Sequence, residues 1–162
     1  MRKIILAFIL ILSLVSAEDF LGEDSHSGFV KIDKDSDIFY WLFRSRTDKT
    51  NDPLVIWLSG GPGCSSSLAL FAENGPFSVN KSSLNLTKNN FSWNQNSNLV
   101  FVDQPVGTGL SYADPAHPSP YCKNMSDVAN DFYYALKELY QNPNGCFNMV
   151  GITGAHPLFV FG

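Results

Sequence analysis

The sequence has little positive charge and no repeated tract. Among its 162 residues, 11 Lys and Arg stand against 15 Asp and Glu, which gives a formal net charge of −4. Proteins bind nucleic acids through clustered Lys and Arg side chains, and no such cluster occurs in this sequence. We therefore expect no nucleic-acid partner. The absence of internal repeats, low-complexity tracts and long linkers limits the chain to one domain at most.

Cysteine is also scarce. Cys64, Cys122 and Cys146 are an odd number, so at least one thiol has no partner within this sequence. A buried thiol that acts as a small hydrophobic group would explain the odd number. An incomplete chain would explain it equally well, and the sequence leaves both explanations open.

Long hydrophobic runs are absent except near the start of the chain. The run from Ile4 to Val15 is shorter than the ~20 apolar residues that span a bilayer. Two basic residues precede the run and small residues follow it, a pattern typical of a cleaved secretory signal. We expect residues 1–17 to be a signal peptide. The remainder, residues 18–162, would then enter the secretory pathway without a stable membrane anchor.

Four Asn-x-Ser/Thr sequons matter in that compartment, because N-glycans are added there. They begin at Asn80, Asn85, Asn90 and Asn124. Three of them lie in the polar stretch 80–98, which is predicted to be at the surface. We expect all four to be glycosylation sites on surface loops.

Hydrophobic patterning predicts a hairpin followed by buried strands. Alternating apolar residues over 29–33 and 37–44, joined by a polar turn at 34–36, predict the hairpin. Short apolar runs predict strands that are covered on both faces of a parallel sheet. These runs are 54–58, 99–102 and 147–153.

Two helices are predicted between the strands. Residues 65–74 form a short helix that ends at Gly75 and Pro76, and apolar residues at helical spacing extend an amphipathic helix through Tyr140. Asn124, with Asp127 three residues later, resembles a capping box at the start of that second helix. Strands that alternate with helices predict the α/β class.

The most distinctive segment is the glycine turn, Ser59 to Ser66, which follows the strand 54–58. A nucleotide site is poorly supported, because the segment lacks the last glycine of G-x-G-x-x-G and no P-loop lysine follows. A purely structural turn would also use Gly and Pro. We favour an oxyanion hole, in which glycine lets backbone N–H groups approach a developing negative charge. Each such donor stabilises the transition state by about 3 kcal/mol.

This segment and four others resemble the serine carboxypeptidases of the α/β-hydrolase fold. The other four are Phe39 to Trp41, Glu73 to Phe77, Trp93 with Asn94, and Val100 to Tyr112. The resemblance spans roughly residues 27–154, the N-terminal part of such an enzyme. It implies a truncated α/β-hydrolase-like sheet with an N-terminal β-hairpin and flanking helices. Residues 18–162 would be an incomplete N-terminal part of that domain.

The resemblance also implies roles for individual residues. Gly61 would donate a backbone N–H to the oxyanion, and Cys64 would pair with a cysteine beyond this sequence. The terminal carboxylate of a peptide would be bound by Trp57, Ser59, Gly60 and Glu73. Ser59 stands where the family has asparagine, and a hydroxyl offers one donor where an amide offers two. Selectivity for a free peptide C-terminus is therefore in question.

The resemblance ends at the nucleophile elbow. In the family, a strand similar to Val150–Gly154 leads to the nucleophilic serine, and here His156 occupies that position. Pro157 follows, and proline has no N–H to serve as the second oxyanion donor. Asp103 is interpreted as a structural loop residue and not as the catalytic acid. The sequence thus predicts no Ser-Asp-His triad and no activity for the chain as written.

Two functions from different classes are consistent with these residues. The favoured one is a secreted or lysosomal/vacuolar member of the serine carboxypeptidase family, which releases C-terminal residues from peptides, here without a triad. The alternative is a secreted non-catalytic peptide-binding protein, or a fragment of a carboxypeptidase-like acyltransferase. We expect a peptide C-terminus as partner, no metal ion and no cofactor.

Overall fold

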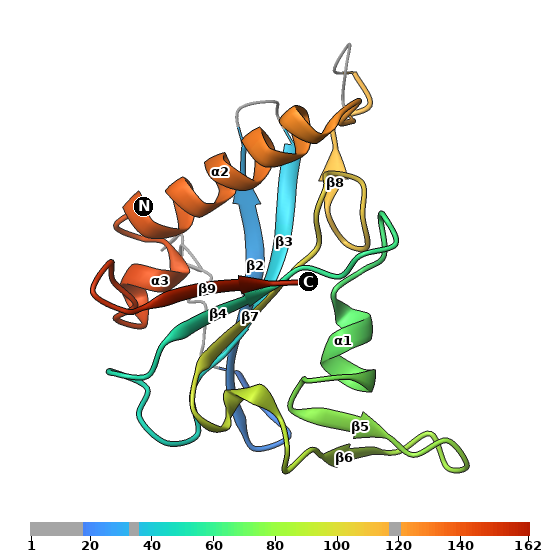
Figure 1. The fold of residues 1–162 in the computed structure, drawn as a ribbon, viewed down its shortest axis with the longest axis vertical. Helices are drawn as coiled ribbons and strands as arrows, with labels where there is room; N and C mark the ends of the chain where they lie inside the picture. Colours follow the sequence, from blue (N-terminus) through green and yellow to red (C-terminus); the bar gives the residue numbers. More distant parts are fainter. Residues whose placement is uncertain (1–17, 33–35, 117–120) are drawn as a thin grey trace, which may run out of the picture.

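The computed structural model describes residues 18–32, 36–116 and 121–162, so the predicted signal peptide and most of the predicted turn at 34–36 lie outside the described residues. A mixed sheet runs in the order β1-β2-β3-β7-β4-β9, with β8 beside β3 (Figure 1). Its strands are β1 (Glu18–Phe20), β2 (Glu23–Lys31), β3 (Ser36–Phe43), β4 (Leu54–Trp57), β7 (Asn98–Val102), β8 (Tyr112–Ala113) and β9 (Leu158–Phe161). The predicted α/β class is confirmed.

The predicted hairpin is confirmed as the antiparallel pair of β2 and β3. Phe29 stands opposite Phe39, and their rings meet edge to face with centroids 5.4 Å apart. Strand β2 begins at Glu23, earlier than predicted, because the polar residues at its start are buried against neighbouring loops.

The parallel part of the sheet consists of β7, β4 and β9, which lie side by side (Figure 1). Leu54, Val55 and Ile56 of β4 are buried on both faces of the sheet, at 0–7% exposure. Strand β7 is buried along its whole length. The strands predicted at 54–58 and 99–102 are confirmed, because continuous apolar runs fit a sheet that is covered on both sides.

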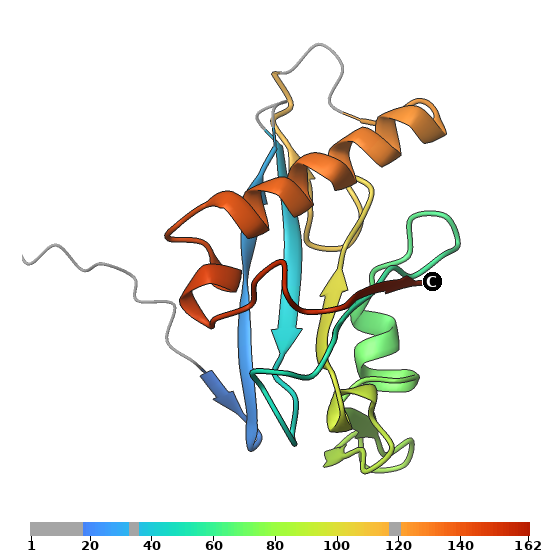
Figure 2. The same cartoon turned by 60° about the vertical axis from the view of Figure 1, so that its left-hand side comes forward.

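Helices cover one face of this sheet, as the two views show (Figures 1 and 2). Helices α2 (Met125–Gln141) and α3 (Cys146–Met149) pack over the core that contains Leu42, Ile56 and Val100. The predicted N-cap of α2 is confirmed, since Asn124 Oδ1 accepts a hydrogen bond from the Asp127 N–H at 3.0 Å.

The opposite face is covered by helix α1 (Ser67–Ala72) and a small hairpin of β5 (Phe77–Val79) and β6 (Leu86–Lys88). Phe43, Phe77 and Leu99 are fully buried in this second core. In the described part of the chain, no helix has the length and apolar character needed to cross a membrane.

The stretch 80–98 differs in part from its prediction as surface. Its first half carries β6 and exposed turns, but its second half folds inward through a 3₁₀ turn, η1 (Trp93–Gln95). Asn94 and Asn98 are fully buried there. Asn94 Nδ2 donates to Glu23 Oε2 at 2.9 Å and to the Arg44 carbonyl at 3.2 Å, so buried polar side chains hold this loop to the sheet.

The strand predicted at 147–153 is wrong. Gly145 and Cys146 begin the short helix α3, and Phe147 packs edge to face on Tyr140 of α2 with ring centroids 5.1 Å apart. Asn148 Nδ2 donates to the carbonyls of Tyr140 and Asn142 and so caps the end of α2. The strand beside β4 is β9, which lies further along the chain.

Candidate functional site

The loops that follow β4 and β7, and Gly162 after β9, lie at the carboxyl edge of the parallel strands, where α/β sheets place their ligand sites. The glycine turn follows β4, and Asp103 follows β7 directly. Gly162 follows β9, and the Leu58 N–H donates to the carbonyl of Phe161 at 2.9 Å. This edge is the candidate functional site.

The glycine turn has a backbone shape that other residues would strain. Gly61 has φ +138°, and a Cβ at this position would lie 2.7 Å from Cys64 Sγ. The Cys64 N–H donates to the Gly60 carbonyl at 3.3 Å and closes the turn. Within the described residues, no hydrogen bond uses the Gly61 N–H, and Gly60 to Cys64 are exposed. The Gly61 N–H of this exposed turn is therefore available to donate to a ligand oxygen.

Ser66 fixes the end of the turn to the sheet. Its Oγ accepts a hydrogen bond from the Ser59 N–H at 3.0 Å and donates to the Val102 carbonyl at 2.6 Å. One buried hydroxyl thus ties both ends of the turn to β7. The turn is held in place by protein groups before any ligand arrives.

Asp103 is the second anchor, and it joins two loops. Oδ1 accepts from the Ser66 N–H at 2.7 Å and from Ser65 Oγ at 2.8 Å. Oδ2 accepts from the Leu110 N–H at 2.9 Å. Gly109 has φ +55°, and a Cβ there would lie 2.1 Å from Asp103 Oδ2, so only glycine allows this approach. The interpretation of Asp103 as a structural loop residue fits these contacts.

The structure brings part of the predicted carboxylate-binding set together. Trp57 Nε1 lies 3.3 Å from Ser59 Oγ, to which it donates, and Gly60 follows Ser59 in the turn. The Trp57 ring packs edge to face on Trp93, with ring centroids 5.4 Å apart. Glu73 is exposed and follows the last residue of α1, so the length of that helix separates it from the turn.

The prediction that His156 stands at the nucleophile position assumed a strand at 147–153, which the structure does not have. The strand parallel to β4 is β9, with Leu158 beside Leu54 and Phe161 beside Trp57. His156 therefore lies before β9, at the amino edge of the sheet. The assignment of His156 itself stays a prediction. The residue that follows β9 toward the glycine turn is Gly162.

The environment of His156 fits this placement. Its Nδ1 accepts a hydrogen bond from the Thr153 N–H at 3.1 Å, and the Leu54 N–H donates to the carbonyl of the next residue, Pro157, at 2.9 Å. His156 is buried at 9% exposure. These contacts make it part of the turn that leads into β9. Pro157 likewise lies at the amino edge, away from the glycine turn.

All four sequon asparagines have exposed positions in the structure. Asn80 and Asn85 lie in the turn between β5 and β6, and Asn90 follows β6. Asn124 is exposed although its Oδ1 caps α2. Exposure is the condition that a glycosylation site requires.

A family model described as "Serine carboxypeptidase" matches residues 17–154 of this sequence. The chain belongs to the serine carboxypeptidase family. The match ends at residue 154, whereas the sheet position beside β4 is occupied by residues after that point.

Individual relatives agree with this family. A "Serine carboxypeptidase-like" protein of Oryza sativa subsp. japonica is 46% identical over 143 residues, which cover 86% of this chain and 32% of the relative. "Serine carboxypeptidase-like 48" of Arabidopsis thaliana is 46% identical over 142 residues, covering 86% of this chain and 26% of the relative. The chain thus spans about a third or less of the length of these carboxypeptidase relatives.

A solved structure confirms the fold. The prohormone-processing carboxypeptidase Kex1(delta)p of Saccharomyces cerevisiae matches with a TM-score of 0.64 and 27% identity, over 85% of this chain and 30% of the yeast chain. The hydrolase-like sheet and its flanking helices are therefore those of a serine carboxypeptidase.

Proposed function

We propose that this chain forms the oxyanion-binding and carboxylate-binding half of a serine carboxypeptidase, a hydrolase that releases C-terminal residues from peptides. The observation that carries the proposal is the glycine turn, in which the exposed Gly61 N–H is unused by the described residues while Ser66 and Asp103 hold the surrounding backbone. A preorganised donor of this kind is what a reacting carbonyl oxygen requires.

In this proposal the Gly61 N–H donates to the carbonyl oxygen of the scissile peptide bond, where negative charge develops. One such donor contributes about 3 kcal/mol to transition-state stabilisation. Gly60 lets the peptide approach the backbone closely, because nothing lies within 4 Å of the place that its Cβ would take. The turn would thus bind the substrate at its reacting carbonyl.

The terminal carboxylate of the peptide is assigned to Ser59, Trp57 and Glu73. Ser59 Oγ accepts from Trp57 Nε1, which leaves the hydroxyl hydrogen available to donate to a carboxylate oxygen. Glu73 would join only in its protonated form, because two carboxylates repel each other. The Ser59 hydroxyl is therefore proposed as the principal contact.

We further propose that the 162-residue polypeptide does not hydrolyse peptides by itself. A serine nucleophile needs an adjacent base. The two described histidines, His26 and His156, contact Asp24 and Thr153, and Ser65 of the glycine turn donates to Asp103. We expect neither turnover of a blocked dipeptide nor serine labelling by a fluorophosphonate.

Binding of a blocked dipeptide with a free C-terminal carboxylate tests the proposal. We expect calorimetry to detect the free acid, and the matching C-terminal amide to bind at least tenfold more weakly. Gly61→Ala should abolish this preference, because its Cβ would collide with Cys64 Sγ and its φ would be strained.

Gly154→Ala is the matched control, since Gly154 is exposed and a Cβ there would meet nothing within 4 Å. It should bind the dipeptide as the unchanged chain does. Equal affinity for acid and amide would overturn the assignment of Ser59 and Trp57. Hydrolysis, or stoichiometric labelling of any serine, would overturn the proposal that the polypeptide is inactive.

The cellular setting is proposed from sequence and exposure. Residues 1–17 are assigned as a signal peptide, and the secretory pathway as the destination, secreted or lysosomal/vacuolar. The exposed sequons at Asn80, Asn85, Asn90 and Asn124 are assigned as glycosylation sites. An N-terminus at residue 18 and a mass decrease on glycosidase treatment of the secreted product are the expected results.

A further inference from the structure

A second concave site lies at the amino edge of the parallel strands, opposite the glycine turn. The site, which we name the basic pocket, has a volume of about 480 Å³. Its charged lining residues are Glu23, Asp24, Arg44, Arg46, Lys49 and Lys88. Four cations therefore face two carboxylates, and the pocket carries an excess of positive charge.

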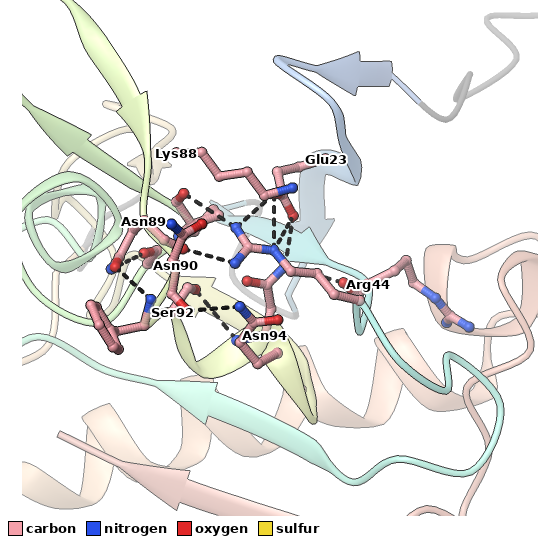
Figure 3. Close-up of polar contacts among 12 residues, drawn as sticks. Glu23, Arg44, Lys88, Asn89, Asn90, Ser92 and Asn94 are labelled. Atoms are coloured by element: carbon pink, nitrogen blue, oxygen red, sulfur yellow. Dashed lines mark hydrogen bonds and ion pairs between the residues drawn. The ribbon is translucent and has the colours of Figure 1, made fainter.

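Glu23 already forms ion pairs with two of these cations. Its Oε1 lies 2.7 Å from Arg46 Nη2 and 3.0 Å from Lys88 Nζ. Arg46 is also held by a third group, because Nη1 donates to the Asn89 carbonyl at 2.8 Å. Figure 3 shows Glu23, Lys88 and Asn94 gathered in this network. The Glu23 carboxylate is thus paired without a ligand.

The Asp24 carboxylate likewise contacts two side chains. Its Oδ2 lies 2.5 Å from Lys49 Nζ, and its Oδ1 lies 3.2 Å from His26 Nε2. The ammonium groups of Lys49 and Lys88 are about half exposed, at 50% and 49% of their side chains. Each ammonium has three hydrogens, so each keeps donors after its ion pair is made.

Arg44 is the cation that lacks a matching acceptor. The residue is 6% exposed, and Nη2 donates to the Lys49 carbonyl at 2.7 Å. Nη1 is buried and has no hydrogen-bond partner among the described residues. The Arg44 side chain extends away from Glu23 and its network (Figure 3). A buried donor without an acceptor is costly, and an anion beside it would remove that cost.

We propose that the basic pocket binds a compact oxyanion, a phosphate or sulfate group, through Arg44 and Lys49. A planar guanidinium and an ammonium group match the several oxygens of such a group. The volume exceeds that of the ion itself, so the group could also be carried as an ester on a sugar. This binding is independent of the peptide site at the opposite edge of the sheet.

Calorimetry on the whole secreted polypeptide at neutral pH and low salt tests the proposal. The probes are inorganic phosphate, inorganic sulfate and glucose 6-phosphate. We expect binding of the oxyanions, and at least a tenfold loss of affinity in Arg44→Gln and in Lys49→Gln. Tighter binding of the ester than of phosphate would identify a sugar ester as the ligand, and equal binding would identify the free ion.

Lys81→Gln is the matched control, because Lys81 is an exposed lysine of the neighbouring β5–β6 turn. It should bind phosphate as the unchanged chain does. Lys49→Gln keeps the proposal testable if Arg44→Gln fails to fold, since the Lys49 side chain is half exposed. Absence of heat with all three probes, or full affinity in Lys49→Gln, would overturn the proposal.

Discussion

At the amino edge of the parallel strands, the buried carboxylate of Glu23 is paired with protein side chains, whereas at the carboxyl edge a backbone donor of the glycine turn has no partner among the described residues. Glu23, Arg46 and Asn94 form a network in which Arg46 makes contacts through all three of its nitrogens. The glycine turn is exposed, and the Gly61 N–H is unused within the described residues. The first arrangement stabilises the fold, and the second is suited to a ligand.

The difference shows where serine carboxypeptidase chemistry can be placed in this sheet. The Arg46 guanidinium already donates to Glu23 and to the Asn89 carbonyl, so a substrate would have to compete with these contacts. The turn can offer a donor because Ser66 and Asp103 fix it from behind. Ser66 and Asp103 thus hold the turn rigid, while Gly61 provides the donor for a ligand.

Substitution of Glu23 should produce the largest effect on stability. Glu23→Gln leaves the Arg46 guanidinium, whose side chain is only 12% exposed, without its carboxylate, and breaking a buried pair costs on the order of 3–5 kcal/mol. The free energy of unfolding, measured with urea at pH 7, should fall by about that amount. Glu138→Gln on α2 is the control, because its Oε1 can still accept from Asn142. A loss below about 1 kcal/mol would break the contrast between the two edges.

The pH dependence sharpens this first prediction. Burial by itself raises the pKa of Glu23, but hydrogen bonds from Arg46, Asn94 and Lys88 and the charge of Arg46 lower it overall from 4.5. A depressed pKa stabilises the folded state above pH 4.5, and this contribution is lost as the pH falls through the lower folded value. The unchanged chain and Glu23→Gln should therefore converge in stability as the pH falls below 4.5.

Asp103→Asn should have a smaller effect on stability but a larger one on binding. The amide can keep one oxygen on Ser66, but its NH₂ then faces the Leu110 N–H, which leaves a donor unsatisfied at a cost of about 1–3 kcal/mol. Affinity for the free-acid dipeptide should fall at least tenfold. Asp114→Asn, an exposed loop aspartate, serves as the control. If affinity is unchanged while stability drops, Asp103 does not position the turn.

Thiol reactivity gives the mildest test of the same contrast. Burial raises the pKa of the Cys146 thiol to about 11, although the hydrogen bond with Tyr40 and the charge of Arg44 lower it in part. Cys64 in the glycine turn is exposed. After reduction, iodoacetamide at pH 7.5 should alkylate Cys64 at least tenfold faster than Cys146, as mass spectrometry would measure. Similar rates would mean that the core opens as readily as the turn.

Much of the fold could be predicted from the sequence because local pattern determines it. The runs at 54–58 and 99–102 are apolar on both faces, and Asn124 with Asp127 marks the start of a helix. The glycine turn could be recognised as well, since only glycine tolerates the φ of +138° at Gly61. These features depend on neighbours in the chain.

The strand beside β4 could not be predicted in this way. Residues 147–153 and 158–161 are both short and apolar, so local preference does not choose between them. Phe147 is held by Tyr140 and Asn148 caps α2, which commits the first segment to a helical turn. The strand expected before His156 was wrong for this reason.

The sequence by itself thus determined the family, the α/β class and the glycine turn, because these depend on residue types at short spacing. Only the tertiary structure decided which segment lies beside β4 and which groups anchor the turn. It also decided that Glu23 meets Arg46 and that Arg44 lies buried without an acceptor for Nη1 among the described residues. Such contacts join residues far apart in the chain, so no local pattern encodes them.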